Sequence, residues 1–400
     1  MATLKLNNNL KATNAIWLPK VPVHWEMVKV RHLFKESTQK GFPNETLLVA
    51  SQEHGVVSKE TYGKRTVEAT KDLHNLKLVE EGDFVISLRS FQGGIEVAHE
   101  RGIISPAYTV MKEKRQIDKR YFKNLFKSPP FISLMTLCVK GIREGQNIDY
   151  PTFKNEYLPF PPLEEQRTIA EYLDKKNNEI DKFIKNKERL VNLLRDKINH
   201  IVSEDKNWIH EKAKWIFDEI KIKNQINEEL LAVTQDRGVI PKRFCEENFV
   251  SPNSFEGLKL VDINDFVISL RSFQGGIEYS NYRGVVSPAY NIIRLKEIYS
   301  SDLYIDFYKY YFKTPKHISL LNTVISGIRD GQNINWSDFK NLILPKPKED
   351  VIKEMVPDFR AYEELKMKFT SELSKIEEYR NSIITDFVIG KRCVLDLQKV

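Results

Sequence analysis

The eleven residues ISLRSFQGGIE, from Ile86 to Glu96, occur again without change from Ile268 to Glu278. The likeness extends outward on both sides, because each copy is preceded by KLV and DFV and followed by SPAY. Farther along the chain, GIREGQNI at Gly141–Ile148 matches GIRDGQNI at Gly327–Ile334. Two long copies of one pattern indicate a duplicated domain, since a solenoid requires several short repeats.

Each copy has the pattern of a mixed α/β domain. Short runs of β-branched and aromatic residues, such as FVISL and GIISPAYTVM, lie between glycines and prolines, which is typical of strands and turns. YFKNLFKSPPFISLM in the first copy and FYKYYFKTPKHISLL in the second are expected to be helical. The second of these is expected to end or kink near Pro315.

A different pattern follows each copy. The segment after Pro162 contains no glycine, and apolar residues recur there at alternating steps of four and three, which predicts a helix with a coiled-coil stripe. A second such segment covers about Asp350–Val388. Each helix of about 40 residues would be on the order of 60 Å long. The predicted apolar seam positions are Leu173, Ile180, Ile184, Val191, Leu194 and Ile198 in the first helix, and Phe369, Leu373, Ile376, Ile383 and Phe387 in the second.

A long helix with one apolar stripe requires a partner that covers the stripe. The simplest partner is the other helix of the chain, and the pair would then be an antiparallel coiled coil. We therefore expect an α+β fold of two homologous mixed α/β domains, separated by two long antiparallel helices with pseudo-two-fold symmetry. In the alternative, each helix packs on its own domain. The predicted parts are a first domain at 1–160, a first helix at 161–204, a second domain at 205–347, a second helix at 348–392 and a tail at 393–400.

The composition permits a nucleic-acid partner without requiring one. In 400 residues, Lys and Arg number 62 and Asp and Glu 55, so the net charge is +7. The three cysteines form no CxxC pair, which disfavours both a disulfide framework and a zinc ribbon. No apolar stretch is long enough for a signal peptide or a membrane span, so we expect a cytoplasmic protein.

The motifs do not favour catalysis by this chain. GxxxxGK[ST] and GxGxxG do not occur, so ATP and dinucleotide sites are not expected. Ser128–Phe131 (SPPF) is similar to an amino-methyltransferase motif, but the second copy reads TPKH at the same place, which favours coincidence. Asp358, Glu364 and Lys366 imitate a PD…ExK nuclease signature inside a predicted helix, where the carboxylates would not converge on a metal ion. We predict no catalytic residue and no metal site.

The order of domains and helices resembles the specificity subunit of type I restriction–modification enzymes. The motifs that carry the resemblance are the SLRSFQGG…SPAY block, GIREGQNIDYPTFK, LPFPPLEEQRTIAEYLD and the terminal IGKR at Ile389–Arg392. WLPKVPVHWEMVKVRHLF at Trp17–Phe34 also resembles the start of that family's first domain. The second helix departs from the pattern, because it opens with LPKPKEDVIKEM instead of PPLEEQ, which predicts a different partner contact at that end.

The resemblance implies two target recognition domains, each of which reads one half of a split site on double-stranded DNA. It also implies that the helices bind two adenine methylation subunits and then two ATP-driven restriction/translocase subunits. The chain itself would catalyse nothing and hold no cofactor. S-adenosylmethionine, ATP and magnesium would be bound only by the partner subunits, and no membrane would be involved.

Comparison of the two copies separates two kinds of candidate DNA-binding residue. Residues identical in both copies cannot distinguish two different half-sites, so they are expected to be scaffold, phosphate contacts or readers of shared bases. They are Arg89, Ser90, Gln92, Gly93, Tyr108, Arg143, Gln146 and Asn147 in the first copy, and Arg271, Ser272, Gln274, Gly275, Tyr290, Arg329, Gln332 and Asn333 in the second. The candidates for discrimination, which differ between the copies, are Lys64, Arg65 and His99 in the first, and Lys242, Arg243, Asn281 and Tyr282 in the second.

Two other functions stay open from the residues alone. The chain could be a coiled-coil adaptor whose duplicated domains bind proteins, which would show in low affinity for DNA. It could also be the recognition part of a fused DNA methyltransferase, which would show in binding of S-adenosylmethionine by the isolated chain.

Overall fold

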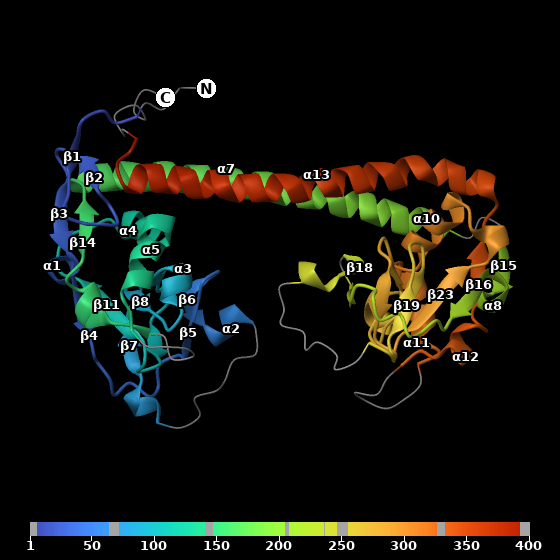
Figure 1. Cartoon of the computed structure of the whole chain (residues 1–400). Helices are drawn as coiled ribbons and strands as arrows, with labels where there is room; N and C mark the ends of the chain where they lie inside the picture. Colours follow the sequence, from blue (N-terminus) through green and yellow to red (C-terminus); the bar gives the residue numbers. More distant parts are fainter. Residues whose placement is uncertain are drawn as a thin grey trace. The chain divides into compact units, whose positions relative to one another are not determined.

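The computed structural model of the chain describes residues 6–63, 72–140, 147–204, 208–235, 237–245, 255–325 and 333–392 (Figure 1). The chain forms two compact units. Unit 1 comprises residues 1–184 and 372–400, and unit 2 comprises residues 185–371. Both long helices are therefore divided, and each contributes one part to each unit.

Unit 1 is built around a four-stranded antiparallel sheet in the order β4-β11-β8-β9. Its strands are β4 (Phe34–Ser37), β11 (Thr109–Glu113), β8 (Phe84–Ile86) and β9 (Glu96–Val97). The two-stranded ladders of this unit are β1 (Leu10–Ala12) with β2 (Lys20–Pro22), β3 (Glu26–Lys29) with β14 (Tyr157–Phe160), β5 (Leu48–Ser51) with β6 (Gly55–Ser58), β7 (Lys77–Val79) with β10 (Gly102–Ile104), and β12 (Val139–Lys140) with β13 (Asn147–Ile148). The shorter helices are α1 (Val30–Leu33), α2 (Lys59–Tyr62), η1 (Leu73–Asn75), α3 (Ser90–Gly93), α4 (Lys119–Lys127), α5 (Pro129–Leu137) and α6 (Tyr150–Phe153).

The position of strand β8 explains its unbroken apolar sequence, FVI. Successive residues of a strand point to opposite faces of the sheet. Phe84 and Ile86 pack in the main core of unit 1, to which α4 and α5 contribute, whereas Val85 packs on the other face with Leu48 and Val56. A strand that is covered on both faces requires apolar residues at every position.

Unit 2 repeats this topology. Its sheet has the order β16-β23-β20-β21, with β16 (Phe217–Ile220), β23 (Asn291–Leu295), β20 (Phe266–Ile268) and β21 (Glu278–Tyr279). The ladders are β15 (Ile209–Lys212) with β24 (Ile343–Lys346), β17 (Leu231–Thr234) with β18 (Gly238–Pro241), and β19 (Lys259–Val261) with β22 (Gly284–Val286). The shorter helices are α8 (Ala213–Ile216), η2 (Lys242–Phe244), α9 (Ser272–Gly275), η3 (Glu297–Tyr299), α10 (Asp302–Tyr311), α11 (Pro315–Asn322) and α12 (Trp336–Phe339).

Both units interrupt the predicted helical segment at the residue before a proline. Ser128 separates α4 from α5, and Thr314 directly precedes α11; both have extended backbone, with φ −72 and ψ 141, and φ −73 and ψ 146. A proline disfavours the α conformation in the residue before it. The prediction of one continuous helix in the first copy is therefore wrong. Pro129 occupies the position that Pro315 has in the second copy, and it interrupts the helix in the same way.

The two long helices are α7 (Leu163–Ile201) and α13 (Glu349–Val388). Helix α7 begins directly after two prolines and has Glu164 and Glu165 in its first turn, where the helix dipole favours negative charge. The predicted segments 161–204 and 348–392 each extend slightly beyond the observed helices.

Within each unit the two helices lie side by side. In unit 1, the rings of Tyr172 and Phe387 are 4.7 Å apart between centroids, and Asp181 forms an ion pair with Arg380. In unit 2, the Lys197 ammonium lies 2.7 Å from a carboxylate oxygen of Asp358. The two unit 1 contacts run in opposite sequence directions, so the helices are antiparallel there. The seam residues are buried (Leu173, Ile180, Ile198, Phe369, Ile383, Phe387) or half-buried (Ile184, Val191, Leu194, Leu373, Ile376).

The ends of the helices also belong to the cores of the units. Leu173 of α7 packs in the main core of unit 1, and so do Ile383 and Phe387 of α13. The Tyr121 hydroxyl donates a hydrogen bond to the carbonyl of Val388, 2.8 Å away. In unit 2, Ile198 of α7 is a core residue. The alternatives considered from the sequence are therefore not exclusive, because the helices pack both on each other and on the sheets.

The predicted fold class, two homologous mixed α/β domains joined by two long helices, is confirmed. Within the ranges that the structure describes, neither the long helices nor the shorter ones have the continuous apolar length that crossing a bilayer requires.

Candidate nucleic-acid interface

The repeated loop has the same internal hydrogen bonds in both units. The backbone amide of Ser87 donates to Ser90 Oγ at 2.8 Å, and the amide of Ser269 donates to Ser272 Oγ at 2.8 Å. Ser90 and Ser272 are each only 1% exposed. Their hydroxyls hold the turn that leads into α3 and α9, and they do not reach the surface. Of the three roles expected for residues identical in both copies, this burial favours the scaffold role for the two serines.

The glycines of the loop allow it to approach the following helix closely. Gly94 has φ +81, and a Cβ there would lie 2.0 Å from the carbonyl oxygen of Phe126 at the end of α4. Gly276 has φ +84 and would meet the carbonyl of Phe312 at 2.2 Å. Only glycine adopts this conformation at low cost in such a space. Gly93 and Gly275 have a similar role, since a Cβ there would overlap the side chain of Gln52 at 2.3 Å or of Gln235 at 2.7 Å.

A lysine and a buried glutamate hold the repeated loop in place in each unit. Lys127 Nζ donates to the carbonyl of Gly93 at 2.9 Å and pairs with Glu96. In unit 2, Lys313 Nζ donates to the carbonyl of Gly275 at 3.0 Å and pairs with the equivalent glutamate. Burial raises the pKa of Glu96, and the attraction of Lys127 opposes this without fully offsetting it. Each pair fixes the loop at the end of the helix that follows it, α4 or α10, which makes the loop a rigid platform.

The platform presents exposed side chains of three kinds in each unit. Arg89 and Gln92 are exposed in unit 1, and Arg271 and Gln274 in unit 2. In the part of the chain that the structure describes, these four side chains have no hydrogen bond or ion pair. A leucine beside each arginine is also exposed. Exposed Arg and Gln side chains on a fixed loop suit contact with phosphates or with base edges.

The residues predicted to discriminate lie directly after this loop. His99 is exposed, and its backbone amide donates to the carbonyl of Val56 at 2.9 Å. Partial burial of the ring and the positive charge of Lys123 lower the pKa of His99, so its imidazole is neutral at pH 7. At the equivalent place in unit 2, Asn281 and Tyr282 are exposed. The two units therefore present different groups beside an identical loop.

The remaining predicted residues fall into three groups. Tyr108 and Tyr290 are half-buried, and their carbonyls accept hydrogen bonds from Lys77 Nζ at 2.7 Å and Lys259 Nζ at 2.6 Å. Arg243 forms an ion pair with a glutamate of its own unit, and its guanidinium lies 4.9 Å from the ring centroid of Phe244. Lys242 and Asn333 are half-buried, whereas Asn147 is exposed on β13. Lys64, Arg65, Arg143, Gln146, Arg329 and Gln332 lie outside the described residues.

Sequence reasoning did not predict a cleft of about 730 Å³ in unit 2. It is lined by α7, α13, α10 and the strand ends near Asn281. Five cationic and three acidic side chains line it, which leaves an excess of two positive charges. Such an excess favours a polyanion at this face. No sequence motif marked the cleft, because its cations come from distant parts of the chain: Arg195, Arg237, Lys309, Lys313 and Lys366.

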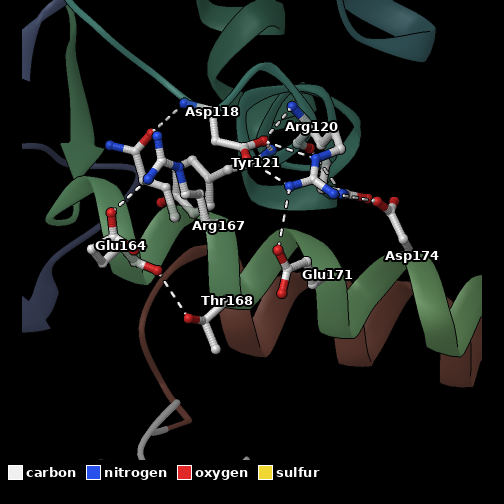
Figure 2. A network of polar contacts seen from close by, with 10 residues as sticks. Asp118, Arg120, Tyr121, Glu164, Arg167, Thr168, Glu171 and Asp174 are labelled. Carbon is white, nitrogen blue, oxygen red and sulfur yellow. Dashed lines mark hydrogen bonds and ion pairs between the residues drawn. The ribbon is translucent and has the colours of Figure 1, made fainter.

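A polar network attaches α7 to the start of α4 in unit 1 (Figure 2). Arg120 of α4 lies 2.8 Å from a carboxylate oxygen of Asp118, 3.3 Å from one of Asp174 and 4.0 Å from one of Glu171. Asp118 is the N-cap of α4, and its side chain accepts hydrogen bonds from two backbone amides. The helix therefore has a defined orientation on the domain that carries the platform.

The motifs that imitate catalytic signatures have structural roles. Ser128 is buried, with its hydroxyl donating to the carbonyl of Leu125 at 2.7 Å, and Phe131 lies in the core. Asp358 of the PD…ExK pattern pairs with Lys197 on the neighbouring helix. Among the described residues, no group of three or more His, Cys, Asp or Glu side chains is arranged to hold a metal ion.

Residues 22–191 match the family model of the type I restriction modification DNA specificity domain. The match defines the class of this chain as a DNA target-recognition protein. Residues 22–191 therefore match that family's DNA specificity domain, and the resemblance that the motifs indicate is confirmed. No curated protein sequence matches the chain.

The chain aligns with several solved structures. A chain from work on complex assembly and conformational transition of the type I R-M system aligns with a TM-score of 0.60 and 14% identity, covering 93% of this chain and 99% of that chain. The HsdS subunit from Thermoanaerobacter tengcongensis aligns with a TM-score of 0.44 and 14% identity over 93% of this chain and 98% of that one. The S subunit of a type I restriction–modification system from M. genitalium aligns with a TM-score of 0.41 and 13% identity, covering 96% of this chain and 98% of that chain.

Proposed function

We propose that the chain is the sequence-specific DNA-binding subunit of a type I restriction–modification complex. Each unit reads one half of a bipartite DNA target, and the chain directs the methylation and restriction subunits to that target. It catalyses nothing itself, and S-adenosylmethionine, ATP and magnesium are bound by the partner subunits. One observation carries this proposal: both units hold the same rigid platform, with exposed Arg and Gln side chains, within a fold whose first half matches a DNA specificity domain.

The differences between the units support a bipartite target. The platforms are identical, but the groups beside them are a neutral histidine in unit 1 and asparagine and tyrosine in unit 2. Two protein surfaces with the same platform but different neighbouring side chains are suited to two DNA half-sites that are related but not identical. A single uniform site would not require the second copy.

Exposed apolar side chains on the long helices support the binding of partner subunits. Leu190 and Leu193 of α7 are 46% and 56% exposed, and Met367 of α13 is 68% exposed. Large apolar residues on the outer face of a helix pair are typical of surfaces that a partner covers. The occupants that fit the proposed complex are its methylation subunits.

Selection from a pool of randomised duplex DNA tests the proposal. The full chain is incubated with the pool at about physiological salt, and bound duplexes are sequenced, because nonspecific phosphate binding dominates at low salt. We expect enrichment of a motif in two parts separated by a spacer of indifferent sequence. Enrichment of a single uninterrupted motif would contradict the bipartite part of the proposal. Retention of all sequences equally would contradict sequence-specific recognition altogether.

A further inference from the structure

The cleft of unit 2 contains more cations than its own carboxylates neutralise. Lys309 of α10 lies 2.9 Å from a carboxylate oxygen of Glu363, and Lys313 pairs with Glu278. These two ion pairs involve two of the three acidic side chains that line the cleft. The three cations that remain, which we call the cleft cations, are Arg195 of α7, Arg237 between β17 and β18, and Lys366 of α13.

The cleft cations keep hydrogen-bond donors available for a ligand. The ion-pair partner of Arg195 is the exposed carboxylate of Asp196, 4.0 Å away. Arg237 donates one N–H to the carbonyl of Phe244 at 3.1 Å, which orients the side chain and leaves the other donors of its guanidinium. Across the described ranges, neither Arg237 nor Lys366 forms an ion pair. Two guanidinium groups and an ammonium group that line one cleft favour an anion with several charged oxygens.

The aromatic rings of the cleft favour a phosphate over a nucleobase as that anion's binding group. Tyr310 is only 8% exposed, and its ring is stacked on that of Phe359 with 4.3 Å between the centroids. Lysine ammonium groups lie 5.5 Å and 5.8 Å from the ring centroids of Tyr279 and Tyr362. A base that stacked in the cleft would have to displace these contacts, whereas phosphate groups require only the cations.

The cleft lies beside a residue that is predicted to read bases. Asn281, a candidate for base discrimination in unit 2, lines the same cleft as Arg237. The phosphates of a duplex flank its base edges, and about half or more of protein–DNA hydrogen bonds go to phosphate and sugar. A duplex whose base edge faces Asn281 therefore brings phosphates to the cleft. A DNA strand fits this position better than a free phosphate compound, which has no use for a neighbouring base reader.

We propose that the cleft of unit 2 binds the sugar–phosphate backbone of one DNA strand, with the cleft cations as phosphate contacts. The two long helices then bind DNA directly through Arg195 and Lys366. This inference rests on the proposed function. The contacts concern one half-site only, because the positions equivalent to the cleft cations in unit 1 hold no lysine or arginine; these are Asn381, His54 and Ile180.

Ethylation interference on the full chain tests the proposal. The duplex selected from the randomised pool is ethylated at its phosphates, which removes their charge, and bound molecules are separated from free ones. We expect ethylation of adjacent phosphates in one half-site to block binding of the wild-type chain. Arg195→Gln and Lys366→Gln should each abolish the interference at their own phosphate in that half and leave the other half unchanged. Each should also lower the magnitude of the salt slope by about 0.9 and weaken binding to all sequences alike.

The control is Arg189→Gln, which removes an exposed charge from α7 outside the cleft. It should leave the interference pattern and the salt slope unchanged. The same result for both cleft variants would overturn the inference while the proposed function stands. Saturable binding of pyrophosphate that Arg195→Gln abolishes, with DNA binding unaffected, would assign the cleft to a free phosphate compound instead.

Two further outcomes also count against the inference. Weaker co-purification of Arg195→Gln with the methylation subunit, with DNA binding unaffected, would assign the cleft to an acidic segment of a protein. If the wild-type chain selects no duplex sequence at all, the proposed function fails, and the inference fails with it.

Discussion

The side-chain oxygen of Gln166 in α7 accepts a hydrogen bond from the backbone amide of Asp118, 2.9 Å away, at the start of α4. The side-chain nitrogen of Gln166 donates to the carbonyl of Pro161 at 2.8 Å, and the residue is fully buried. This glutamine is the last letter of the PPLEEQ motif. It joins the long helix to the recognition domain by satisfying one buried donor and one buried acceptor. In unit 2 the equivalent position is the buried apolar residue Ile352.

Gln166→Ile tests the importance of this connection. The substitution introduces the residue that unit 2 uses, but it leaves the amide of Asp118 and the carbonyl of Pro161 without a partner. We expect the free energy of unfolding of unit 1 to fall by about 1–3 kcal/mol. Urea unfolding of the full chain measures the change. The control is Arg167→Ala at the adjacent exposed position. This substitution should change the free energy of unfolding by no more than about 0.5 kcal/mol. Equal effects of the two substitutions would contradict this role of Gln166.

His317→Phe should remove part of the acid sensitivity of unit 2. His317 is fully buried, and within the described residues neither of its ring nitrogens has a hydrogen-bond partner. Burial lowers its pKa from 6.5 to about 3. Between those values the unfolded chain binds a proton that the folded chain does not, so stability falls as the pH decreases through this window, by about 1.4 kcal/mol per pH unit. The phenylalanine does not titrate, so the variant should lose this slope.

The reciprocal substitution provides a matched control. Phe131 occupies the same position in unit 1 and is also fully buried. Phe131→His should give unit 1 the acid sensitivity that a buried histidine produces. Urea unfolding at pH 7 and pH 5 measures both variants. If His317→Phe loses as much stability as the wild-type chain between these pH values, protonation of His317 does not contribute to acid unfolding.

His99→Ala should change base preference, whereas Arg89→Ala should change general affinity. His99 is a neutral side chain found only in unit 1, so its loss should relax preference in the corresponding half-site by roughly 5- to 150-fold. Arg89 carries a charge that can meet phosphate, so its loss should weaken binding to all duplexes and reduce the salt dependence by about one counterion. Binding isotherms on matched and mismatched duplexes at several salt concentrations separate the two effects. An equal loss on all sequences for His99→Ala would refute its assignment.

Leu193→Glu should impair complex assembly without unfolding the chain. Leu193 is 56% exposed on α7, so a charged residue there costs little stability in the isolated chain. It would place a charge in the contact proposed for a methylation subunit. We expect weaker co-purification with that subunit and unchanged binding to DNA. The control is Lys185→Glu, on an exposed polar part of the same helix. Unchanged co-purification of Leu193→Glu would place the partner contact elsewhere.

Much of the fold could be predicted because its signals are local. The period of the apolar residues located both long helices, and the short β-branched and aromatic runs between glycines and prolines indicated the strands. The duplication showed that the chain contains two copies of the same mixed α/β domain. The continuous helix expected across Ser128 was wrong, since the effect of the following proline was applied only to the second copy.

The features that could not be predicted from the sequence depend on contacts between residues far apart in the chain. Nothing in the seam pattern shows that Ile383 and Phe387 belong to the core of unit 1, because an apolar residue packs equally well on a helix or on a sheet. The burial of Ser90 was also not predictable, since a serine beside an arginine has the same sequence signature whether it holds a turn or contacts a ligand. The cleft of unit 2 combines Arg195 with Lys309, and no local pattern connects them.

Mapping of DNA methylation in a host with and without this chain tests the central claim most directly, provided that the methylation subunits are present in both. The account predicts a two-part motif, methylated on adenine, that disappears when the chain is removed. An unchanged methylation pattern would contradict it.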